Sequence, residues 1–239
     1  LRFTSDYLKE NGFLVSQQPV DEKRYNICIY PQEKKPRILF LGHLDTVGAY
    51  DLNAYQAKEV DAYIYGLGSC DMKGGCAAMI EAFIAYRQNF GDYPEAALAL
   101  VVGEEETADG TKRLLEDFHS PYAIVAEPTN GHVCTGHYGY VELEITTRGQ
   151  RRHPSVATRD HDAIYHMLEI LRTIITYLDN NKSGIVYNIR DVHSSEAGFS
   201  VADSCIASLD LHIPPSEDIS RIITHVTERI SGLVETSAA

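Results

Sequence analysis

The chain has 239 residues, of which 44% are hydrophobic and 23% are charged, values typical of one large or two modest globular domains and not of a disordered segment. Its formal net charge is −13, from 34 acidic and 21 basic residues, which disfavours nucleic acid and anionic membrane surfaces as partners. The sequence contains no apolar run near the roughly 20 residues that span a membrane, and no signal-peptide pattern. Five scattered cysteines without a C-x-x-C pair suit a reducing compartment, so we expect a cytoplasmic protein.

The first 134 residues predict strands that alternate with helices. The expected elements are a helix at 1–11, strands at 25–30 and 37–41, a polar irregular stretch at 48–62, a strand at 62–66, a helix at 73–88, a strand at 96–102, a helix at 110–117 and a strand at 122–126. This alternation predicts an α/β domain with a mainly parallel sheet and flanking helices.

Near residue 135 the pattern changes. The expected elements are a half-buried strand at 141–149, a helix at 160–178, strands at 184–191 and 201–213, and a helix that follows Pro214 and Pro215. The order βαββα predicts a smaller α+β domain over residues 135–239, with one antiparallel sheet and two helices.

Four short segments carry acidic or histidine side chains where strands are expected to end. They are GHLDTV at 42–47, GSCDMKGG at 68–75, GEEE at 103–106 and AEPT at 126–129. The donors they offer are His43, Asp45, Asp71, Glu104, Glu105, Glu106 and Glu127. The carboxyl ends of parallel strands meet at one edge of a sheet, where open α/β sheets bind ligands. One imidazole among carboxylates suits zinc, manganese or cobalt, so the sequence predicts a metal site with hydrolytic chemistry.

Each segment taken alone has a plainer interpretation. A histidine two residues before an aspartate is commonly a structural hydrogen-bonded pair, and an acidic triplet is commonly a solvated loop. The joint occurrence of the four segments at predicted strand ends favours the metal site. Cys70, next to Asp71, is a soft-ligand alternative, although a small buried side chain is the favoured interpretation.

The four segments, in this order, resemble those of the dinuclear zinc hydrolases that include aminoacylases, acetylornithine deacetylase, succinyl-diaminopimelate desuccinylase and the bacterial glutamate carboxypeptidases. The resemblance runs along nearly the whole chain and is specific for the family but not for a substrate. It implies two divalent ions, zinc with cobalt or manganese as alternatives, and removal of the acyl group from an N-acyl amino acid. A dipeptidase or carboxypeptidase would use the same ions, and a non-catalytic binding protein would retain the fold while losing ligands.

The same resemblance implies a role for each matched residue. His43 and Glu127 would bind one ion, Glu105 would bind the other, and Asp71 would bridge the two. A further histidine ligand, opposite Glu105, is expected in a return of the α/β domain beyond residue 239, together with a last strand of the small domain. The start at Leu1, within a predicted helix, likewise leads us to expect a preceding segment.

In the family pattern the first glutamate of the acidic triplet is the base, so Glu104 would take a proton from the water shared by the two ions. Asp45 would orient the imidazole that binds metal. Glu106 is then a bystander.

The small domain carries two further family-like segments. In GQRRHPS (149–155), His153 corresponds to a histidine that reaches the active site of a partner subunit and donates to the oxyanion, which implies a homodimer through residues 135–239. A basic surface loop is the alternative interpretation. In SLDLHIPP (208–215), His212 stands where the family often has an arginine for the substrate carboxylate. Arg151, Arg152 or Arg190 are the candidates that would replace it.

Overall fold

The apolar runs of the first half form a five-stranded sheet in the computed structural model, which describes residues 1–31, 36–91, 95–181 and 184–235. Its strands are β1 (Ser16–Pro19), β2 (Tyr25–Ile29), β3 (Ile38–His43), β6 (Ala96–Val101) and β7 (Tyr122–Val125), in the order β1-β2-β6-β3-β7. β6, β3 and β7 run parallel, whereas β2 pairs antiparallel with β6 and β1 antiparallel with β2. The sheet is therefore mixed, the α/β class is confirmed, and the predicted motifs follow its parallel strands.

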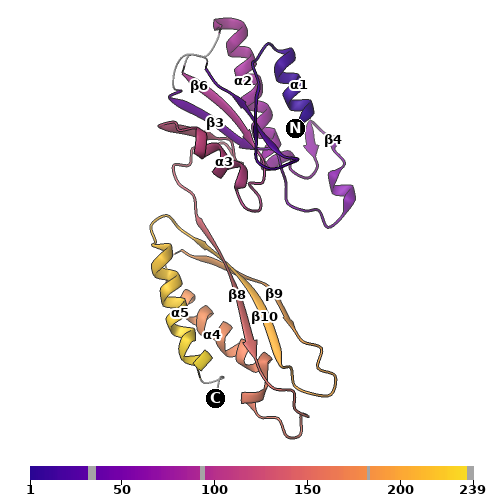
Figure 1. Ribbon diagram of the computed structural model, residues 1–239, viewed down its shortest axis with the longest axis vertical. Coiled ribbons are helices and arrows are strands. Elements are labelled where there is room, and N and C mark those ends of the chain that lie inside the picture. The colour runs from indigo at the N-terminus through magenta and orange to yellow at the C-terminus, as the bar shows by residue number, and fades with distance from the viewer. Residues whose placement is uncertain (32–35, 92–94, 182–183, 236–239) are drawn as a thin grey trace. The chain divides into compact units, whose positions relative to one another are not determined.

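Helices cover both faces of this sheet (Figure 1). On one face, α1 (Arg2–Glu10) and α2 (Gly74–Phe90) pack against the side chains of Leu98 and Leu100. On the other face, α3 (Asp109–Asp117) packs against the alternate residues of β6. Since successive side chains of a strand point to opposite faces, one apolar run serves both layers.

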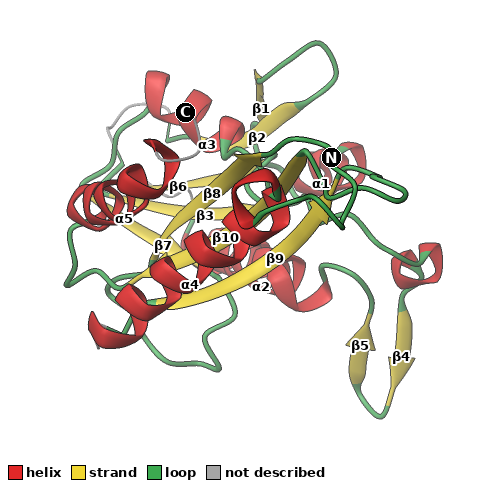
Figure 2. Cartoon of the chain, turned by 90° about the horizontal axis from the view of Figure 1, so that it is seen from below, coloured by secondary structure: helices red, strands yellow, loops and turns green. Residues whose placement is uncertain are grey.

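Two short segments of the first half were not predicted as structure. β1 is polar and buries only Gln18, so it offers no apolar alternation that would identify it as a strand. The stretch 48–62 contains a 3-10 turn (Leu52–Tyr55) and β4 (Lys58–Val60), which forms a hairpin with β5 (Tyr63–Tyr65). β5 lies within the strand predicted at 62–66, whereas β4 was not predicted because each of its residues is exposed and burial leaves no pattern in its sequence. The hairpin projects from the sheet in Figure 2.

The second half forms a three-stranded antiparallel sheet with two helices on one face (Figures 1 and 2). The elements are β8 (Gly139–Arg148), a 3-10 turn (Arg159–His161), α4 (Ala163–Asn181), β9 (Val186–Ser194), β10 (Ser204–Ile213) and α5 (Ile219–Glu235), and the strand order is β8-β10-β9. α4 begins later than predicted because Asp162 caps it, accepting a hydrogen bond from the backbone N–H of Ile164 at 2.9 Å.

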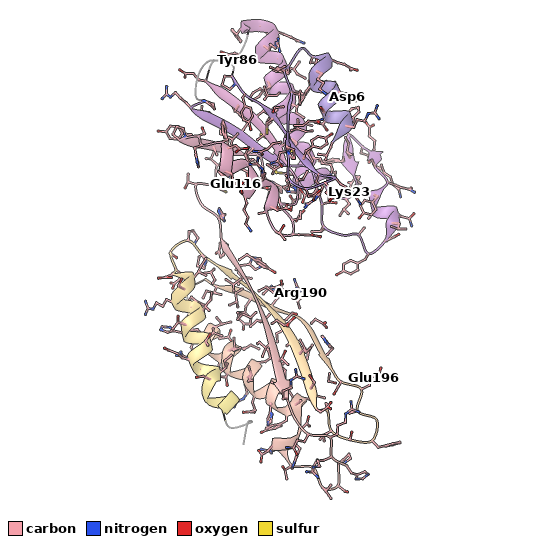
Figure 3. All side chains as sticks on the ribbon, viewed as in Figure 1. Asp6, Lys23, Tyr86, Glu116, Arg190 and Glu196 are labelled. Carbon is pink, nitrogen blue, oxygen red and sulfur yellow. The ribbon has the colours of Figure 1, made fainter. Side chains whose placement is uncertain are left out.

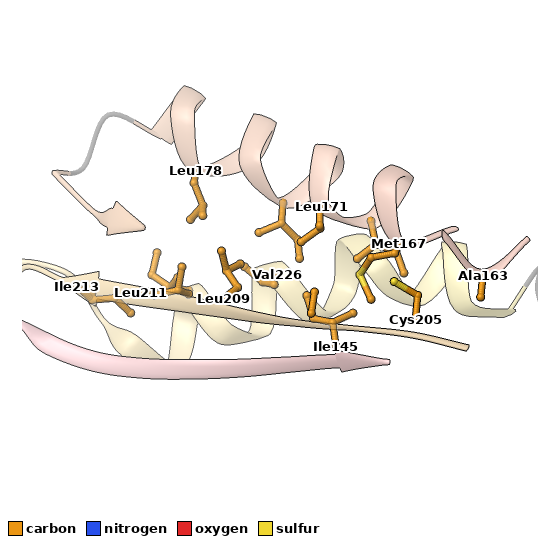
Figure 4. Packing of buried hydrophobic residues seen from close by; sticks show 14 residues of the cluster. Ile145, Ala163, Met167, Leu171, Leu178, Cys205, Leu209, Leu211, Ile213 and Val226 are labelled. Atoms are coloured by element: carbon orange, nitrogen blue, oxygen red, sulfur yellow. The ribbon is translucent and has the colours of Figure 1, made fainter. Parts of the chain in front are cut away.

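The core of this half lies between the sheet and the helices. Figure 4 shows Met167, Leu171 and Leu178 of α4 pointing toward the strand that carries Leu209 and Leu211. β10 alternates buried and half-buried residues along its whole length, as the sequence pattern predicts. Complete burial of a side chain such as that of Leu209 contributes about 1.5–3 kcal/mol to stability.

The chain divides into two compact units, Leu1–Val133 and Cys134–Ala239. Within the part of the chain that the structure describes, no helix has the length and apolar character needed to cross a membrane.

Candidate metal centre

His43 is the last residue of β3 and its side chain is only 1% exposed. The parallel register pairs it with Val101, the last residue of β6, so the histidine stands at the carboxyl edge of the parallel strands. Its backbone N–H donates to Sδ of Met72 at 3.3 Å, and its carbonyl accepts from the thiol of Cys76 at 3.2 Å. Met72 is fully buried and follows Asp71 through a cis peptide bond. The chain that enters α2 therefore packs directly on the end of β3.

Two carboxylates from other segments converge on the imidazole. Nε2 of His43 lies 3.2 Å from Oδ1 of Asp71 and 3.8 Å from Oε1 of Glu127. Potential ligand atoms of these three residues all lie within 4.8 Å of one another. Glu127 is brought close by α2, because a Cβ on Gly75 would lie only 2.1 Å from the carbonyl oxygen of Ala126. Only glycine allows the helix to approach this strand end so closely.

The acidic triplet lies beside this group on non-strand backbone. Oε2 of Glu104 is 3.7 Å from Nε2 of His43. The backbone N–H of Glu105 donates to Oδ2 of Asp45 at 3.1 Å, and burial, followed by the negative charge of Asp71, raises the pKa of Glu105. Glu106 is not one of the three residues that can share an ion, and it lines a pocket of about 450 Å³ together with Arg24, Asp45 and Thr46. Neighbouring glutamates thus diverge, as the irregular backbone at a strand end allows.

Asp45 lies behind the imidazole. Nδ1 of His43 is 3.2 Å from the backbone oxygen of Asp45 and 3.6 Å from its Oδ1. That Oδ1 is buried and has no hydrogen-bond partner among the described residues. Both neighbours of Nδ1 are acceptors, so a proton on Nδ1 has a partner there. With the proton on Nδ1, Nε2 presents its lone pair to the side of the three carboxylates, which is the arrangement needed to bind a metal ion through Nε2.

The electrostatics of the group fit a divalent cation. Burial and the negative charge of Asp71 raise the pKa of Glu127 to about 7. Carboxylates that gather around an unprotonated nitrogen repel one another, and a cation between them would relieve this repulsion. The donor set of one imidazole nitrogen and several carboxylate oxygens is one that zinc, manganese and cobalt accept. We conclude that these residues fit such an ion.

The remaining thiol and histidine candidates lie elsewhere. Cys70 is exposed, so the interpretation of a buried side chain is wrong: in this turn Met72, two residues later, enters the core. His119 is exposed, His193 lies 3.3 Å from a carboxylate oxygen of Asp191, and His225 contacts a tyrosine of the small unit. None of them belongs to the group around His43.

His153 lies in the second unit on an exposed loop, where its Nδ1 accepts a hydrogen bond from the backbone N–H of Ser155 at 3.3 Å. Nδ1 is also 2.7 Å from the hydroxyl oxygen of the same serine. Because Nδ1 serves as an acceptor, Nε2 of the neutral ring carries the proton. His153 is therefore free to donate that proton outward.

The three arginines that could replace His212 differ in their partners. Arg190 of β9, labelled in Figure 3, forms ion pairs with Glu142 and Asp210. Arg151 pairs with Asp203 at 3.0 Å.

Arg152 has a hydrogen bond of 3.4 Å to the amide oxygen of Gln150 and no carboxylate within ion-pair distance among the described residues. His212 itself packs its ring against Tyr140, with centroids 5.3 Å apart. Of the three arginines, Arg152 is thus the one whose charge is not already balanced.

Sequence reasoning missed the residues that support the acidic loop. Asn26 is completely buried in β2 and hydrogen-bonds to the start of α3. One asparagine within the apolar run YNICI gives no local signal, because its partners are residues distant in sequence. Met72 was also missed as a contact of His43, since a methionine next to an aspartate is unremarkable in sequence.

Comparison with known proteins gives the family. The sequence profile of peptidase family M20/M25/M40 matches residues 39–223. A probable carboxypeptidase of Ajellomyces capsulatus is 34% identical over 190 residues, which cover 70% of this chain and 43% of that protein. An acetylornithine deacetylase of Photorhabdus laumondii is 27% identical over 249 residues, which cover 95% of this chain and 64% of that protein. The chain thus spans less than two thirds of the length of these relatives.

Solved structures show the same fold. An M20 family metallo-carboxypeptidase, Sso-CP2 of Sulfolobus solfataricus, superposes with a TM-score of 0.74 at 13% identity, covering 97% of this chain and 70% of that one. A dinuclear metal-binding M20 peptidase of Bacillus subtilis superposes with a TM-score of 0.65 at 14% identity, covering 98% of this chain and 63% of that one. The profile match over most of the chain, on a fold whose four motifs meet at one sheet edge, shows that the chain belongs to peptidase family M20/M25/M40.

Proposed function

We propose that this chain carries the metal site of a hydrolase that removes the acyl group from an N-acyl amino acid. The observation that carries the proposal is the convergence of His43, Asp71 and Glu127, with the carboxylate of Glu104 only 3.7 Å from the imidazole. The similarity to an acetylornithine deacetylase over nearly the whole chain supports an acylated amino acid as substrate.

The proposed ligands divide between two ions. His43 and Glu127 would hold one ion, Glu105 would hold the other, and Asp71 would serve both. When bound, the ions would polarise the scissile carbonyl and lower the pKa of a water toward neutrality. The carboxylates fix where that positive charge resides, and Asp45 keeps the proton of the imidazole on Nδ1, away from the metal side.

Glu104 acts as the general base. Oε2 of its carboxylate lies 3.7 Å from Nε2 of His43, and the side chain is 44% exposed, so the carboxylate can reach a water held beside the ligand group. It takes the proton of that water as the oxygen attacks the amide carbon. It then gives the proton to the leaving amine nitrogen, so that the C–N bond breaks to a free amine and a carboxylate.

His153 is assigned to the developing oxyanion. The proton on its Nε2 is the donor that such a site uses, and its Nδ1 is oriented by Ser155. In this proposal the histidine serves the site of a second subunit, and residues 135–239 form the homodimer contact. If His153 belongs only to a basic surface loop, its loss will leave turnover unchanged.

A second candidate function is a carboxypeptidase or dipeptidase activity. It is favoured by the 34% identity to a protein named as a probable carboxypeptidase. The same ligands and the same base would serve, because amide and peptide bonds require the same attack on a carbonyl carbon. The two candidates differ in the group on the amine side and on the acyl side, not in the metal centre.

A substrate screen tests these functions. Purified protein with added Zn²⁺, Co²⁺ or Mn²⁺ is assayed against acetyl-ornithine, acetyl-lysine, succinyl-diaminopimelate and a set of dipeptides, with Glu104→Gln as the blank. Release of free amine from an acyl-amino acid supports the deacylase, and preferential cleavage of peptides supports the second candidate. Metal binding without any turnover would overturn both and indicate a binding protein that retains the fold.

A further inference from the structure

The two ends of the acidic loop, residues 103–108, are tied together by one buried side chain. Asn26 is 0% exposed. Its amide nitrogen donates to the backbone oxygen of Gly110 and to the side-chain oxygen of Gln18, each at 2.8 Å, and its amide oxygen accepts from the backbone N–H of Val102 at 3.3 Å. Val102 precedes the loop and Gly110 follows it, so a single residue of β2 holds both ends.

The ends of the loop also bind each other. The backbone N–H of Gly110 donates to the oxygen of Val102 at 3.1 Å, and a Cβ on Gly110 would lie 2.1 Å from that oxygen. Within the loop, the carbonyl of Gly103 accepts from the backbone N–H groups of Thr107 and Ala108, at 3.2 and 2.7 Å. The loop that carries the glutamates is therefore a short closed turn with few conformations available.

An ion pair fixes the first residue of the same loop. Nη2 of Arg24 lies 2.5 Å from Oδ2 of Asp109, and Nε of Arg24 lies 2.6 Å from Oδ2 of Asp21. A Cβ on Gly103 would lie 2.0 Å from the other carboxylate oxygen of Asp109 and 2.8 Å from Nη1 of Arg24. The ion pair thus packs against the backbone at the point where the loop leaves β6.

The middle of the loop has its own anchor, the hydrogen bond from the backbone N–H of Glu105 to Asp45. The loop is thus held at its two ends by hydrogen bonds, at its first residue by the ion pair and in its middle by this bond. The backbone that carries the glutamates therefore has little freedom to move. Metal ligands and bases must be held within fractions of an ångström of their working positions, and supporting contacts of this kind supply that precision.

We propose that Arg24 and Asn26 are positioning residues for Glu104 and Glu105. They act through the loop ends and touch neither an ion nor a substrate. The roles of Glu104 as base and Glu105 as ligand are taken from the proposed function. The central measurement is metal affinity, which can be made without any turnover. Asn26 closes the loop and Arg24 supports its first residue.

The purely structural alternative is that these contacts only stabilise the fold. The chain offers a matched control, an ion pair at the end of the sheet opposite to the acidic loop. Arg37, just before β3, pairs with Glu95, just before β6, at 3.6 Å. This ion pair is also partly exposed and also joins two segments of the sheet, but it lies at the amino ends of the parallel strands.

The experiment compares Arg24→Met, Arg24→Lys, Asn26→Asp and Arg37→Met. For each purified variant we measure the melting temperature, the Zn²⁺ dissociation constant by competition with a chromophoric chelator, the Co²⁺ absorption spectrum, and kcat and KM.

Arg24→Met should lower Zn²⁺ affinity and kcat roughly 10-fold or more. KM should change little, and Arg24→Lys should recover part of the loss in Zn²⁺ affinity. The melting temperature without metal records the stability that the ion pairs of Arg24 contribute. Asn26→Asp removes the donor to Gly110, and in the folded protein it should show the same loss with an altered Co²⁺ spectrum.

Arg37→Met should match the wild type in Zn²⁺ affinity and kcat. Wild-type affinity in Arg24→Met, or an equal loss in Arg37→Met, would overturn the proposal for Arg24. A folded Asn26→Asp with an unchanged Co²⁺ spectrum would overturn it for Asn26. If the wild type turns over no substrate, the proposed function fails, and the Zn²⁺ and Co²⁺ measurements still decide whether these residues position the loop.

Discussion

Nε2 of His43 and Oδ1 of Asp71 lie 3.2 Å apart, although 28 positions separate the two residues in the chain. The contact joins the end of β3 to the turn that enters α2. It exists because Met72 and Cys76 of the second segment hydrogen-bond to the backbone of His43. Packing of α2 on the sheet therefore sets the ligand geometry, and the following predictions depend on this arrangement.

Glu104→Gln should lower kcat by about 10² or more and leave the metal content unchanged. An amide of the same size keeps the shape of the loop but cannot accept the proton of the water. Metal analysis and steady-state kinetics of the same preparation check both halves of the prediction.

The neighbouring glutamates serve as controls for this assignment. Glu105→Ala should reduce metal occupancy, because the proposed ligand is removed, whereas Glu106→Gln should be close to wild type in both measurements. An active Glu104→Gln together with an inactive Glu106→Gln would show that the base is the third glutamate and not the first.

Asp45→Asn should weaken Zn²⁺ binding by roughly 10-fold or more. The negative charge of the buried carboxylate, 3.6 Å from Nδ1 of His43, favours a proton on that nitrogen, and an amide can present its NH₂ group there instead. Competition with a chelator measures the change. Asp6→Asn, at an exposed position of α1 and labelled in Figure 3, is the control and should bind Zn²⁺ as the wild type does.

Removal of metal by a chelator should lower the melting temperature, and added Zn²⁺ should raise it in a concentration-dependent manner. Binding to the folded state alone stabilises it by about 2.7 kcal/mol at 100 times the dissociation constant. Thermal scans at several Zn²⁺ concentrations test this expectation. His43→Ala should abolish the Zn²⁺-dependent shift, and a shift that survives would place the ion elsewhere.

Stability should fall in acid through the contacts of the β1–β2 turn. Backbone N–H groups of Lys23 and Arg24, and then the guanidinium of Arg24, lower the pKa of Asp21 from 3.8 to about 2. Arg24 also lowers the pKa of Asp109. A lowered folded-state pKa stabilises the fold above the ordinary value, and this contribution is lost as the pH falls from 3.8 toward 2. Urea midpoints at pH 5 and pH 3 should differ less in Asp21→Asn than in the wild type.

His153→Ala should lower kcat by about 10²–10³ without loss of metal, and light scattering should show a dimer. His161→Ala is the matched control, because this histidine of the same loop also accepts a backbone N–H bond at its Nδ1. Co-expression of His153→Ala with Glu104→Gln should restore activity, since one site of the mixed dimer then combines an intact base with an intact histidine. A monomer, or a mixture that stays inactive, would contradict an oxyanion donor supplied by a second subunit.

Local patterns allowed most of the fold to be predicted. Apolar runs identified β3, β6 and β7, and alternation identified β8, because burial on one or both faces leaves a periodic signal. The polar strands β1 and β4 were missed, since neither buries enough apolar surface to leave such a signal, whereas β5 lies within the strand predicted at 62–66. The antiparallel pairing of β2 with β6, which makes the sheet mixed, depends on chain direction and leaves no trace in composition.

The sequence by itself determined the chemistry available: one histidine and several carboxylates in four segments placed where strands would end, three of them directly after an apolar run. Tertiary structure decided which of them meet. His43, Asp71 and Glu127 form one group because α2 and two parallel strands bring their segments together, whereas Glu106 lies outside this group and lines a pocket with Asp45. Local sequence encodes donor type and strand periodicity. The distance between two ligand atoms depends on packing between segments that are remote along the chain. Examples are the close approach of Gly75 to Ala126 and the hydrogen bonds from Asn26 to both ends of the acidic loop.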